Sequence, residues 1–245
     1  MIGIIAGREV RSALVTPLPW ILLGGGQVVL SWIFLKVVDD FAGLEADERV
    51  ASLTLELTLN LFGFAAVILM LAAPLMAMRM LSGELRDGSF ELVAAAPVRI
   101  GQLVIGKYLA LVGLMTPLCL LPILNLAWIA GIADLDPGQV AAATLGLWLA
   151  GLMFCSVGLY ASSLSTQPGA SVLVAFSILL VFSIIGRAES LASPGLSLFG
   201  WLSWNEHLFW FLAGAVRASD IAYFLSFAGV FLALSHRRLS NRYLQ

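Results

Sequence analysis

The sequence predicts an all-α integral membrane protein with six transmembrane helices, and three observations predict this fold class. Apolar residues make up 60% of the 245 residues and charged residues only 11%, far from the roughly 25% charged residues of soluble domains. Mean hydropathy is +0.99. The charges are clustered, and they divide the chain into apolar segments of the roughly 20 residues that a spanning helix needs. We expect a single transmembrane domain over residues 1–245.

The amino-terminal segment 1–13 mixes apolar and charged side chains. The apolar residues Ile2 and Ile5 are followed by the charged residues Arg8, Glu9 and Arg11. This combination favours a short helix lying at the membrane interface. The apolar run that follows is too long for the hydrophobic region of a signal peptide, and no small-residue cleavage site follows it. We therefore expect an interfacial helix that leads directly into the first span.

Six apolar segments are predicted to cross the membrane, at about 19–38, 57–78, 108–132, 140–164, 170–185 and 220–235. Pro117 and Pro122 lie inside the third and are expected to kink it or unwind it locally. No charge occurs between residues 137 and 186, so the fourth and fifth spans are separated by the turn-forming segment 165–169.

The basic residues predict the orientation. With six spans, nine of the 13 lie near the two termini or in the segment 79–107, which places these parts in the cytoplasm. Both termini on one side require an even number of crossings. The aromatic segment 187–219 is therefore read as short, partly re-entrant helices on the outer side rather than as a seventh span. The predicted location is the inner, cytoplasmic membrane.

The segment 79–107, between the second and third spans, mixes charged and apolar residues most closely. The sequence Asp87-Gly88-Ser89 reads as a turn followed by an N-cap, and Glu91 stands where a carboxylate favours a helix N-terminus. A short helix over 90–96 should end before Pro97. The segment predicts a cytoplasmic elbow, and a solvated loop is the alternative.

The order of residues in this elbow resembles a known family. The pattern Glu84-x-Arg86-x-Gly88-Ser89-x-Glu91-Leu92, then Pro97, then Gly106-Lys107 resembles the membrane subunits of type 2 ABC exporters. The likeness is greatest to permeases of the gliding-motility and nitrous-oxide-reductase-maturation kind. Arg8-Glu9 followed by Thr16-Pro17, and the carboxy-terminal stretch from Val216 to Arg238, resemble the same permeases.

The resemblance implies that the elbow is the coupling helix, seated in a groove of a separate ATPase subunit. The residues implied in ATPase coupling are Glu84, Arg86, Asp87, Gly88, Ser89, Glu91 and Leu92. The implied partners are an ABC-type ATPase dimer, which would bind ATP and Mg, and a second copy or a paralogue of the permease. We assign the dimer contact to Gly24, Gly25 and Gly26, with the small residues from Gly169 to Ser171 on the fifth span, because small residues let helices approach closely.

The chain lacks the motifs of an enzyme. Gly101-x-x-x-x-Gly106-Lys107 approaches a P-loop, but Tyr108 stands where Ser or Thr would hold Mg²⁺, and no strand precedes the glycines. Cys119 and Cys155 lie in apolar runs without metal or disulfide spacing. No cofactor, metal site, catalytic residue or nucleic-acid partner is expected in this chain.

Four polar residues are candidates for a substrate path or an outer gate. Asn60 and Asn125 lie within spans and read either as interhelical hydrogen-bond partners or as path residues. Glu206 and His207 read either as an outer gate or as a satisfied interfacial pair. Ionisable residues are lacking near the membrane midplane, which disfavours an ion-coupled transporter.

The function that the sequence predicts is the transmembrane subunit of an ABC transporter, surrounded by membrane lipids. One alternative is a non-transporting mechanotransmitter or scaffold that acts on an extracytoplasmic protein, and another is an ATP-independent channel or carrier. The segment 187–219 would shape an exit in a transporter and grip a partner in a mechanotransmitter. The cargo is left open.

Overall fold

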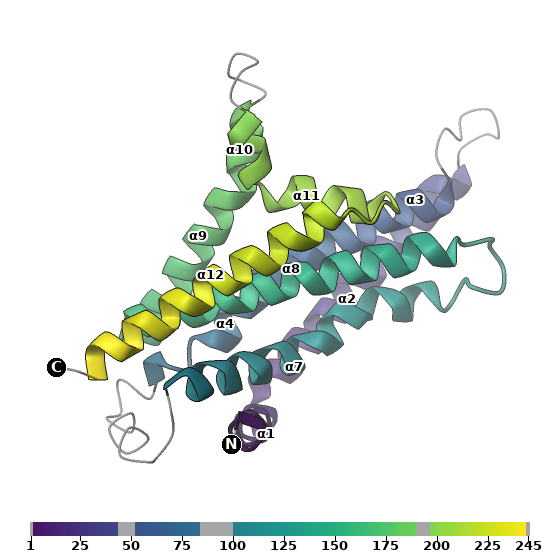
Figure 1. Cartoon of the computed structure of the whole chain (residues 1–245). Coiled ribbons are helices and arrows are strands. Elements are labelled where there is room, and N and C mark those ends of the chain that lie inside the picture. The colour runs from purple at the N-terminus through teal and green to yellow at the C-terminus, as the bar shows by residue number, and fades with distance from the viewer. Residues whose placement is uncertain (1, 44–51, 84–99, 190–196, 244–245) are drawn as a thin grey trace.

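The computed structural model describes residues 2–43, 52–83, 100–189 and 197–243, and the regular structure in these ranges is entirely helical (Figure 1). The helices are α1 (Ile2–Val15), α2 (Pro17–Gly43), α3 (Leu53–Leu57), the π-helical turn η2 (Thr58–Phe62), α4 (Gly63–Ala77), α7 (Ile100–Leu126), α8 (Pro137–Leu164), α9 (Pro168–Glu189), α10 (Ser197–Leu202), α11 (Trp204–Leu212) and α12 (Ala218–Tyr243). The elements α3, η2 and α4 follow one another without a break.

Six of these helical segments are long and apolar enough to cross a membrane, which confirms the predicted fold class. They are Pro17–Gly43, Leu53–Ala77, Ile100–Leu126, Pro137–Leu164, Pro168–Gly186 and Ala218–Asn241. The helix α1 is separate from the first span, and the two short helices α10 and α11 stand between the fifth and sixth spans.

The third span differs from its predicted bounds at both ends. It begins at Ile100 rather than Tyr108, because Lys107 lies inside the helix with its side chain buried and does not mark a helix end. It ends at Leu126 rather than Ile132, and the residues between form hydrogen-bonded turns. The helix assignment is uninterrupted at Pro117 and Pro122, so the local unwinding considered from sequence is not seen.

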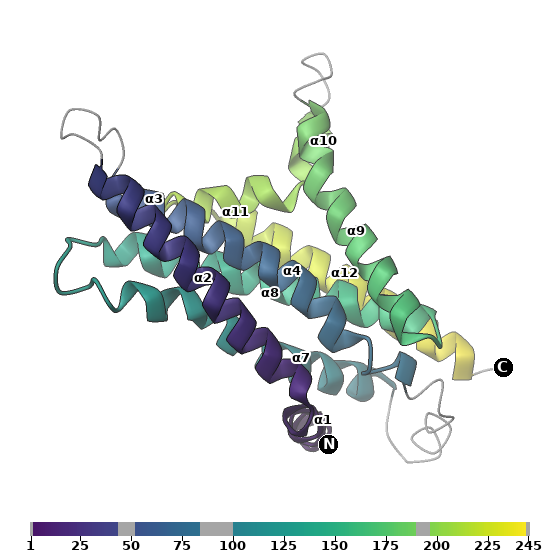
Figure 2. The ribbon, with the colours of Figure 1, turned by 180° about the vertical axis from the view of Figure 1, so that it is seen from behind.

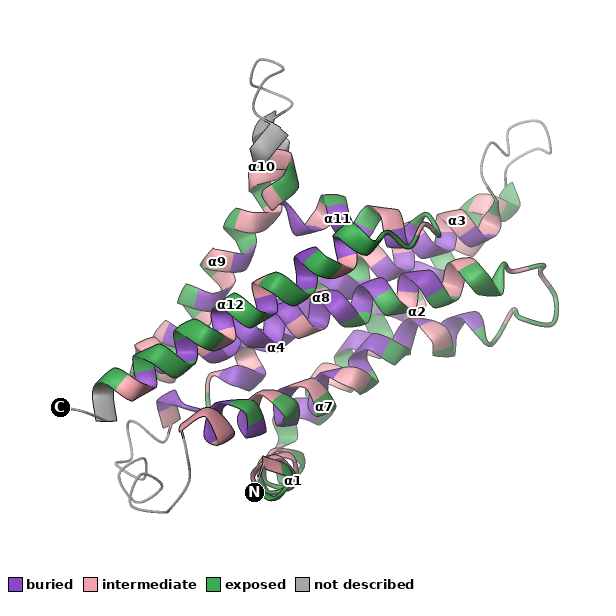
Figure 3. Ribbon diagram, viewed as in Figure 1, coloured by how far each residue is buried: buried purple, intermediate pink, exposed green. Residues whose placement is uncertain are grey.

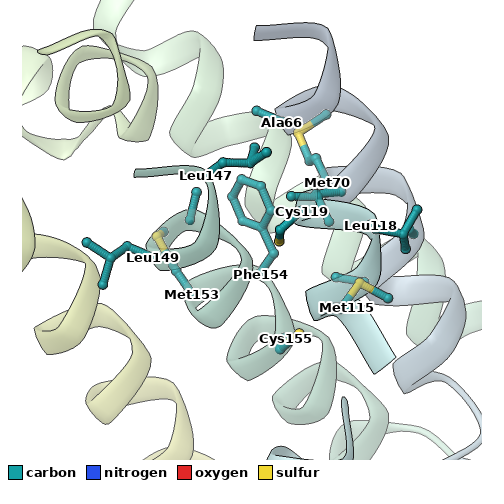
Figure 4. Packing of buried hydrophobic residues seen from close by; sticks show 14 of the residues in the cluster. Ala66, Met70, Met115, Leu118, Cys119, Leu147, Leu149, Met153, Phe154 and Cys155 are labelled. Atoms are coloured by element: carbon teal, nitrogen blue, oxygen red, sulfur yellow. The ribbon is translucent and has the colours of Figure 1, made fainter. Parts of the chain in front are cut away.

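The helix α8 forms the centre of the bundle. It contacts α4, α7, α9, α11 and α12, and buried residues run along both α8 and α4 (Figure 3). Phe154 of α8 lies between side chains of α4 and α7, including Met70 and Cys119 (Figure 4). Its ring also meets Trp204 edge to face, with ring centroids 5.1 Å apart. Cys119 and Cys155 are both buried and free.

The two termini lie at the same end of the bundle (Figure 1). The chain reaches Gly83, the last described residue before 84–99, and resumes at Ile100 at this end as well. The link between α7 and α8 lies at the opposite end. Seen from behind, α9 and α10 diverge from the other helices (Figure 2). An even number of spans, as predicted from the charge pattern, places both termini at one end of the bundle, in agreement with this structure.

Candidate functional site

The predicted coupling residues Glu84, Arg86, Asp87, Gly88, Ser89, Glu91 and Leu92 lie outside the described residues. The site is therefore built from the described parts of the chain that flank them. On the amino-terminal side, the backbone amides of Leu81 and Ser82 donate to Ser162 Oγ at 3.2 and 3.0 Å. Ser162 belongs to the central helix α8, so the chain is anchored to the core immediately before the elbow.

On the carboxy-terminal side of the elbow, the first turns of α7 pack against α1. Gly106 permits this contact, because a Cβ atom there would lie 2.9 Å from Ile5 Cγ2 and 3.3 Å from the carbonyl oxygen of Ile2. A larger residue would have to displace α1, since one of these neighbours is backbone. Gly106 therefore acts as a small residue at a close helix crossing, which the P-loop-like spacing does not indicate.

Beside this crossing, Lys107 and Glu9 form an ion pair between α7 and α1. Lys107 Nζ donates to Glu9 Oε1 at 3.1 Å, and the lysine side chain is 0% exposed whereas that of Glu9 is 14% exposed. The same Oε1 accepts from Arg8 Nη2 at 3.2 Å. A lysine fully removed from water needs a countercharge. Lys107 is thus a buried ion-pair partner of α1.

The joint between α1 and α2 is short and held by side chains. Only Thr16 separates the two helices, and its Oγ1 donates to the carbonyl oxygen of Ala13 at 2.6 Å. Trp20 Nε1 reaches back from α2 and donates to the carbonyl oxygen of Leu14 at 2.9 Å. The end of α1 is therefore fixed to the first turn of the first span.

Asn125 links α2 and α7 inside the bundle. Its Oδ1 accepts from Ser31 Oγ at 2.9 Å and from Gln27 Nε2 at 3.3 Å, and its Nδ2 donates to the carbonyl oxygen of Leu121 at 3.1 Å. Asn125 is only 3% exposed. The prediction of an interhelical hydrogen-bond partner is confirmed for Asn125, and sequence reasoning had not identified Ser31 as its partner. A role in a substrate path stays a prediction.

Asn60 occupies a different environment, in the π-helical turn η2. Its Nδ2 donates to the carbonyl oxygen of Glu56 at 2.9 Å and to Glu56 Oε2 at 3.3 Å, so the hydrogen bonds described for it lie within its own helical segment. Asn60 and Glu56 line a cavity of about 530 Å³ together with Lys36 and Asp40 of α2. The cavity therefore brings charges of both signs to one end of the first two spans.

His207 lies in a buried network rather than at an open gate. Its Nδ1 is 2.7 Å from Asp220 Oδ1, its Nε2 is 2.9 Å from the carbonyl oxygen of Trp201, and its ring stacks on Tyr223 with centroids 3.9 Å apart. Both ring nitrogens of His207 therefore have a hydrogen-bonding partner on another element. The network joins α10, α11 and α12.

The neighbouring Glu206 is exposed, whereas Asp220 is 3% exposed. The carboxylate that pairs with His207 is therefore Asp220, 13 residues further along the chain, rather than the adjacent Glu206. An isolated acidic residue at the start of an apolar segment is the signal that points to Asp220. Its Oδ2 is buried without a hydrogen-bond partner among the described residues.

The three glycines assigned to the dimer contact do not lie in one environment. A Cβ atom at Gly24 or Gly25 would meet nothing within 4 Å, whereas one at Gly26 would lie 3.4 Å from Leu121 of the same chain. The outer face of α2 near Gly24 and Gly25 also exposes large apolar side chains, including Ile21 and Val28. The dimer contact stays a prediction, and these two glycines are the ones available to it.

A large cavity lies between α7 and α8. Its volume is about 880 Å³, and its lining includes Leu120, Ile123, Leu145 and Trp148 with few polar atoms. Among the described residues, no group of three or more His, Cys, Asp or Glu side chains is placed to hold a metal ion. The polar features described above are instead ion pairs and hydrogen-bond clusters between helices.

Together these observations define a multi-pass membrane protein whose described residues form an apolar helical bundle. The model of the family described as ABC-2 family transporter protein matches residues 10–195, more than half of the chain. The chain belongs to this family. It is accordingly a transmembrane subunit of an ABC transporter, a class that works with an ABC ATPase subunit. Comparison with curated proteins gave no match.

Proposed function

We propose that this chain is the membrane subunit of an exporter that is driven by ATP hydrolysed on a separate ATPase subunit. The observation that carries the proposal is the family match over residues 10–195, which includes the elbow as well as five of the six spans. The flanks of the elbow lie at the end of the bundle that holds both termini (Figure 1). The positive-inside pattern assigns this end to the cytoplasm, where the ATPase would bind.

The sequence of the elbow suits docking in a groove. On a continuous helix, an apolar ridge would lie beside an acidic stripe with spacing i, i+3 and i+7. The ridge would consist of Leu81, Leu85 and Leu92, and the stripe of Glu84, Asp87 and Glu91. In this proposal the leucines supply binding energy to the ATPase, and the carboxylates fix the register against a basic rim. The resemblance to gliding-motility and nitrous-oxide-reductase-maturation permeases supports the same role.

The burial of the spans supports a dimeric assembly. In an 18-residue apolar stretch of each span, only 22% of the residues of α2 and 17% of those of α9 are buried. These are the two lowest values among the six spans. The helix α4 contacts both of them, and the three lie on the same side of the bundle (Figure 2). We propose that a second copy or a paralogue covers this side, with Gly24 and Gly25 at the contact and lipid around the rest.

A second candidate function is a mechanotransmitter that acts on an extracytoplasmic protein. It is favoured by the way in which α9 and α10 diverge from the bundle (Figure 1), and by the buried His207–Asp220 pair that connects α11 to α12. A partner gripped there would move with the sixth span. No observation on the described residues favours the third alternative, an ATP-independent channel or carrier.

The coupling role is tested by Glu91→Lys in the complex that co-purifies with the tagged chain. We expect the variant to insert and dimerise, but the change in ATP turnover that the permease imposes on its ATPase should be lost, because the reversed charge meets a basic rim. Glu84→Lys should act in the same direction more weakly, being closer to the membrane. Normal ATPase binding and normal turnover in Glu91→Lys would show that the elbow is only a solvated loop.

A further inference from the structure

The contact between α1 and α7 is both close and charged. At Gly106 the two backbones approach so nearly that a Cβ atom would lie 3.0 Å or less from two atoms of the Ile5 side chain. One residue further on, Lys107 is fully buried with its Nζ 3.1 Å from Glu9 Oε1. Steric fit and ion pairing thus fix the same crossing point. Replacing Glu9 by a cation would place a like charge beside the fully buried Lys107.

The helix α1 depends on this contact for its position. None of its residues is fully buried, and its partly buried face packs mainly against α7. On its other face, Ile4 is 72% exposed and the Arg8 side chain 62% exposed. An amphipathic helix of this kind lies at the membrane surface, and contacts with the spans determine its position there. The ion pair between Glu9 and Lys107 provides such a contact, between α1 and the third span.

The ion pair between Glu9 and Lys107 lies close in sequence to the predicted coupling residues of the elbow. Lys107 is seven residues beyond Ile100, where α7 begins directly after residues 84–99. At a rise of about 1.5 Å per residue this is roughly 10 Å along the helix. A displacement of the elbow therefore reaches Lys107 within the first two turns of α7. At its other end, α1 is joined to α2 through Thr16 and the Trp20 hydrogen bond.

We propose that Glu9 and Lys107 are positioning residues that make α1 and the first turns of α7 one rigid unit, and that this unit carries displacement of the elbow into the first span. The inference rests on the proposed function, because the ATPase supplies the displacement. It adds a second route out of the elbow, through α1 to α2, besides the direct route along α7. The exposed face of α2 at Gly24 and Gly25 would then respond to the nucleotide state of the ATPase.

The rigidity of the unit is measured on the full chain in lipid nanodiscs, without ATPase. Nitroxide labels are attached to cysteines introduced at Gly7 of α1 and Gly113 of α7, in a background with Cys119→Ala and Cys155→Ala. A Cβ atom at either glycine meets nothing within 4 Å, so the labels disturb no packing. Double electron–electron resonance then gives the distribution of distances between α1 and α7.

We expect a narrow distribution in the unmodified pair and one about twofold broader in Glu9→Lys, where a second cation meets the buried Lys107 and repels it. The swap Glu9→Lys with Lys107→Glu should restore most of the narrow distribution. Arg11→Glu, which reverses an exposed charge on the same helix, is the matched control and should leave it unchanged. A distribution that stays narrow in Glu9→Lys would overturn the proposal.

The transmission of elbow displacement through α1 is measured on the complex with the co-purified ATPase. Labels are placed at Gly7 of α1 and at Gly63 of α4, where a Cβ atom also has open space. ATP trapped by vanadate should shift this distance in the unmodified chain and in the charge swap. In Glu9→Lys this shift should be largely lost, because α1 would no longer follow the first turns of α7. A shift that persists in Glu9→Lys would overturn the transmission through α1. Absence of any ATPase would overturn the proposed function instead, and the nanodisc result would still decide whether the unit is rigid.

Discussion

Buried charge at single residues marks the contacts that hold the accessory helices to the spans. Glu9 and Lys107 join α1 to α7, and His207 and Asp220 join α11 to α12. Each pair links residues that are distant in sequence, and each includes a group at least nine-tenths buried. In such surroundings the unpaired charge is the costly state, so loss of one partner costs far more than the pair contributes by itself.

The first prediction concerns the His207 network. Asp220→Ala should lower the free energy of unfolding by about 1 to 3 kcal/mol, because it leaves a buried ring nitrogen of His207 without its hydrogen-bond partner. Thermal unfolding in detergent measures the loss. Glu206→Gln is the matched control, since it removes an exposed carboxylate next to His207, and it should change stability by no more than about 0.5 kcal/mol. Equal effects of the two substitutions would contradict this hydrogen bond.

The sequence predicted some of these residues and missed others for a physical reason. Asn125 could be predicted as an interhelical partner because an amide inside an apolar span has to be satisfied. Lys107 and Glu9 could not be paired from sequence, because 98 residues separate them and each stands near other charges. His207 was assigned to its neighbour Glu206, whereas helical geometry turns adjacent residues to different faces.

At the scale of helices, glycines permit several of the close contacts between neighbouring elements. A Cβ atom at Gly146 would lie 2.4 Å from Phe211 Cβ, one at Gly158 2.8 Å from Ala77 Cβ, and one at Gly186 2.6 Å from Ser203 Cβ. These three positions let α8 approach α11 and α4, and let the end of α9 approach the residue between α10 and α11. Close packing replaces the hydrophobic driving force that lipid does not provide between helices.

The second prediction compares two glycines in spanning helices. Gly158→Ala should destabilise the protein by about 1 to 3 kcal/mol, because the new methyl group is forced against Ala77 and the backbone of Ala73. Gly113→Ala, at a position with open space, should be neutral or stabilising by up to about 1 kcal/mol through helix propensity. Melting temperatures of the two variants in one detergent provide the measurement, and a stable Gly158→Ala variant would contradict the packing of α4 on α8.

The positions of the glycines in the sequence do not by themselves indicate which of them make these contacts. The run Gly24-Gly25-Gly26 stands out in the sequence, yet only Gly26 faces another helix of the chain. Gly106 and Gly158 are isolated glycines, and their roles depend on which face of the helix turns inward. That direction is fixed by tertiary packing, and all-apolar helices carry almost no amphipathic signal to indicate it.

For the molecule as a whole, hydropathy was sufficient to predict the number of spans. Spanning helices need about 20 apolar residues because every backbone polar group must be satisfied within the helix. The bounds of the third span were less predictable, since buried pairing with Glu9 allows α7 to include Lys107. The extra turns of α12 beyond Ser235 likewise carry exposed arginines, Arg237 and Arg238, into the water phase.

The third prediction concerns topology. With both termini in the cytoplasm, Gly131→Cys in the link between α7 and α8 should react with a membrane-impermeant maleimide in intact cells. Asn241→Cys, near the end of α12, should react only after the cells are opened. Both positions are exposed, so access depends on sidedness alone. Labelling of Asn241→Cys from outside would contradict the six-span orientation.

The central claim is that this chain is a permease powered by a separate ATPase bound at its elbow. Purification of the tagged full-length chain in mild detergent, followed by mass spectrometry and an ATPase assay, tests it most directly. The account predicts that an ABC ATPase co-purifies in equal numbers with the permease and that the complex hydrolyses ATP. Recovery of the chain alone, without a nucleotide-binding protein and without ATPase activity, would contradict it.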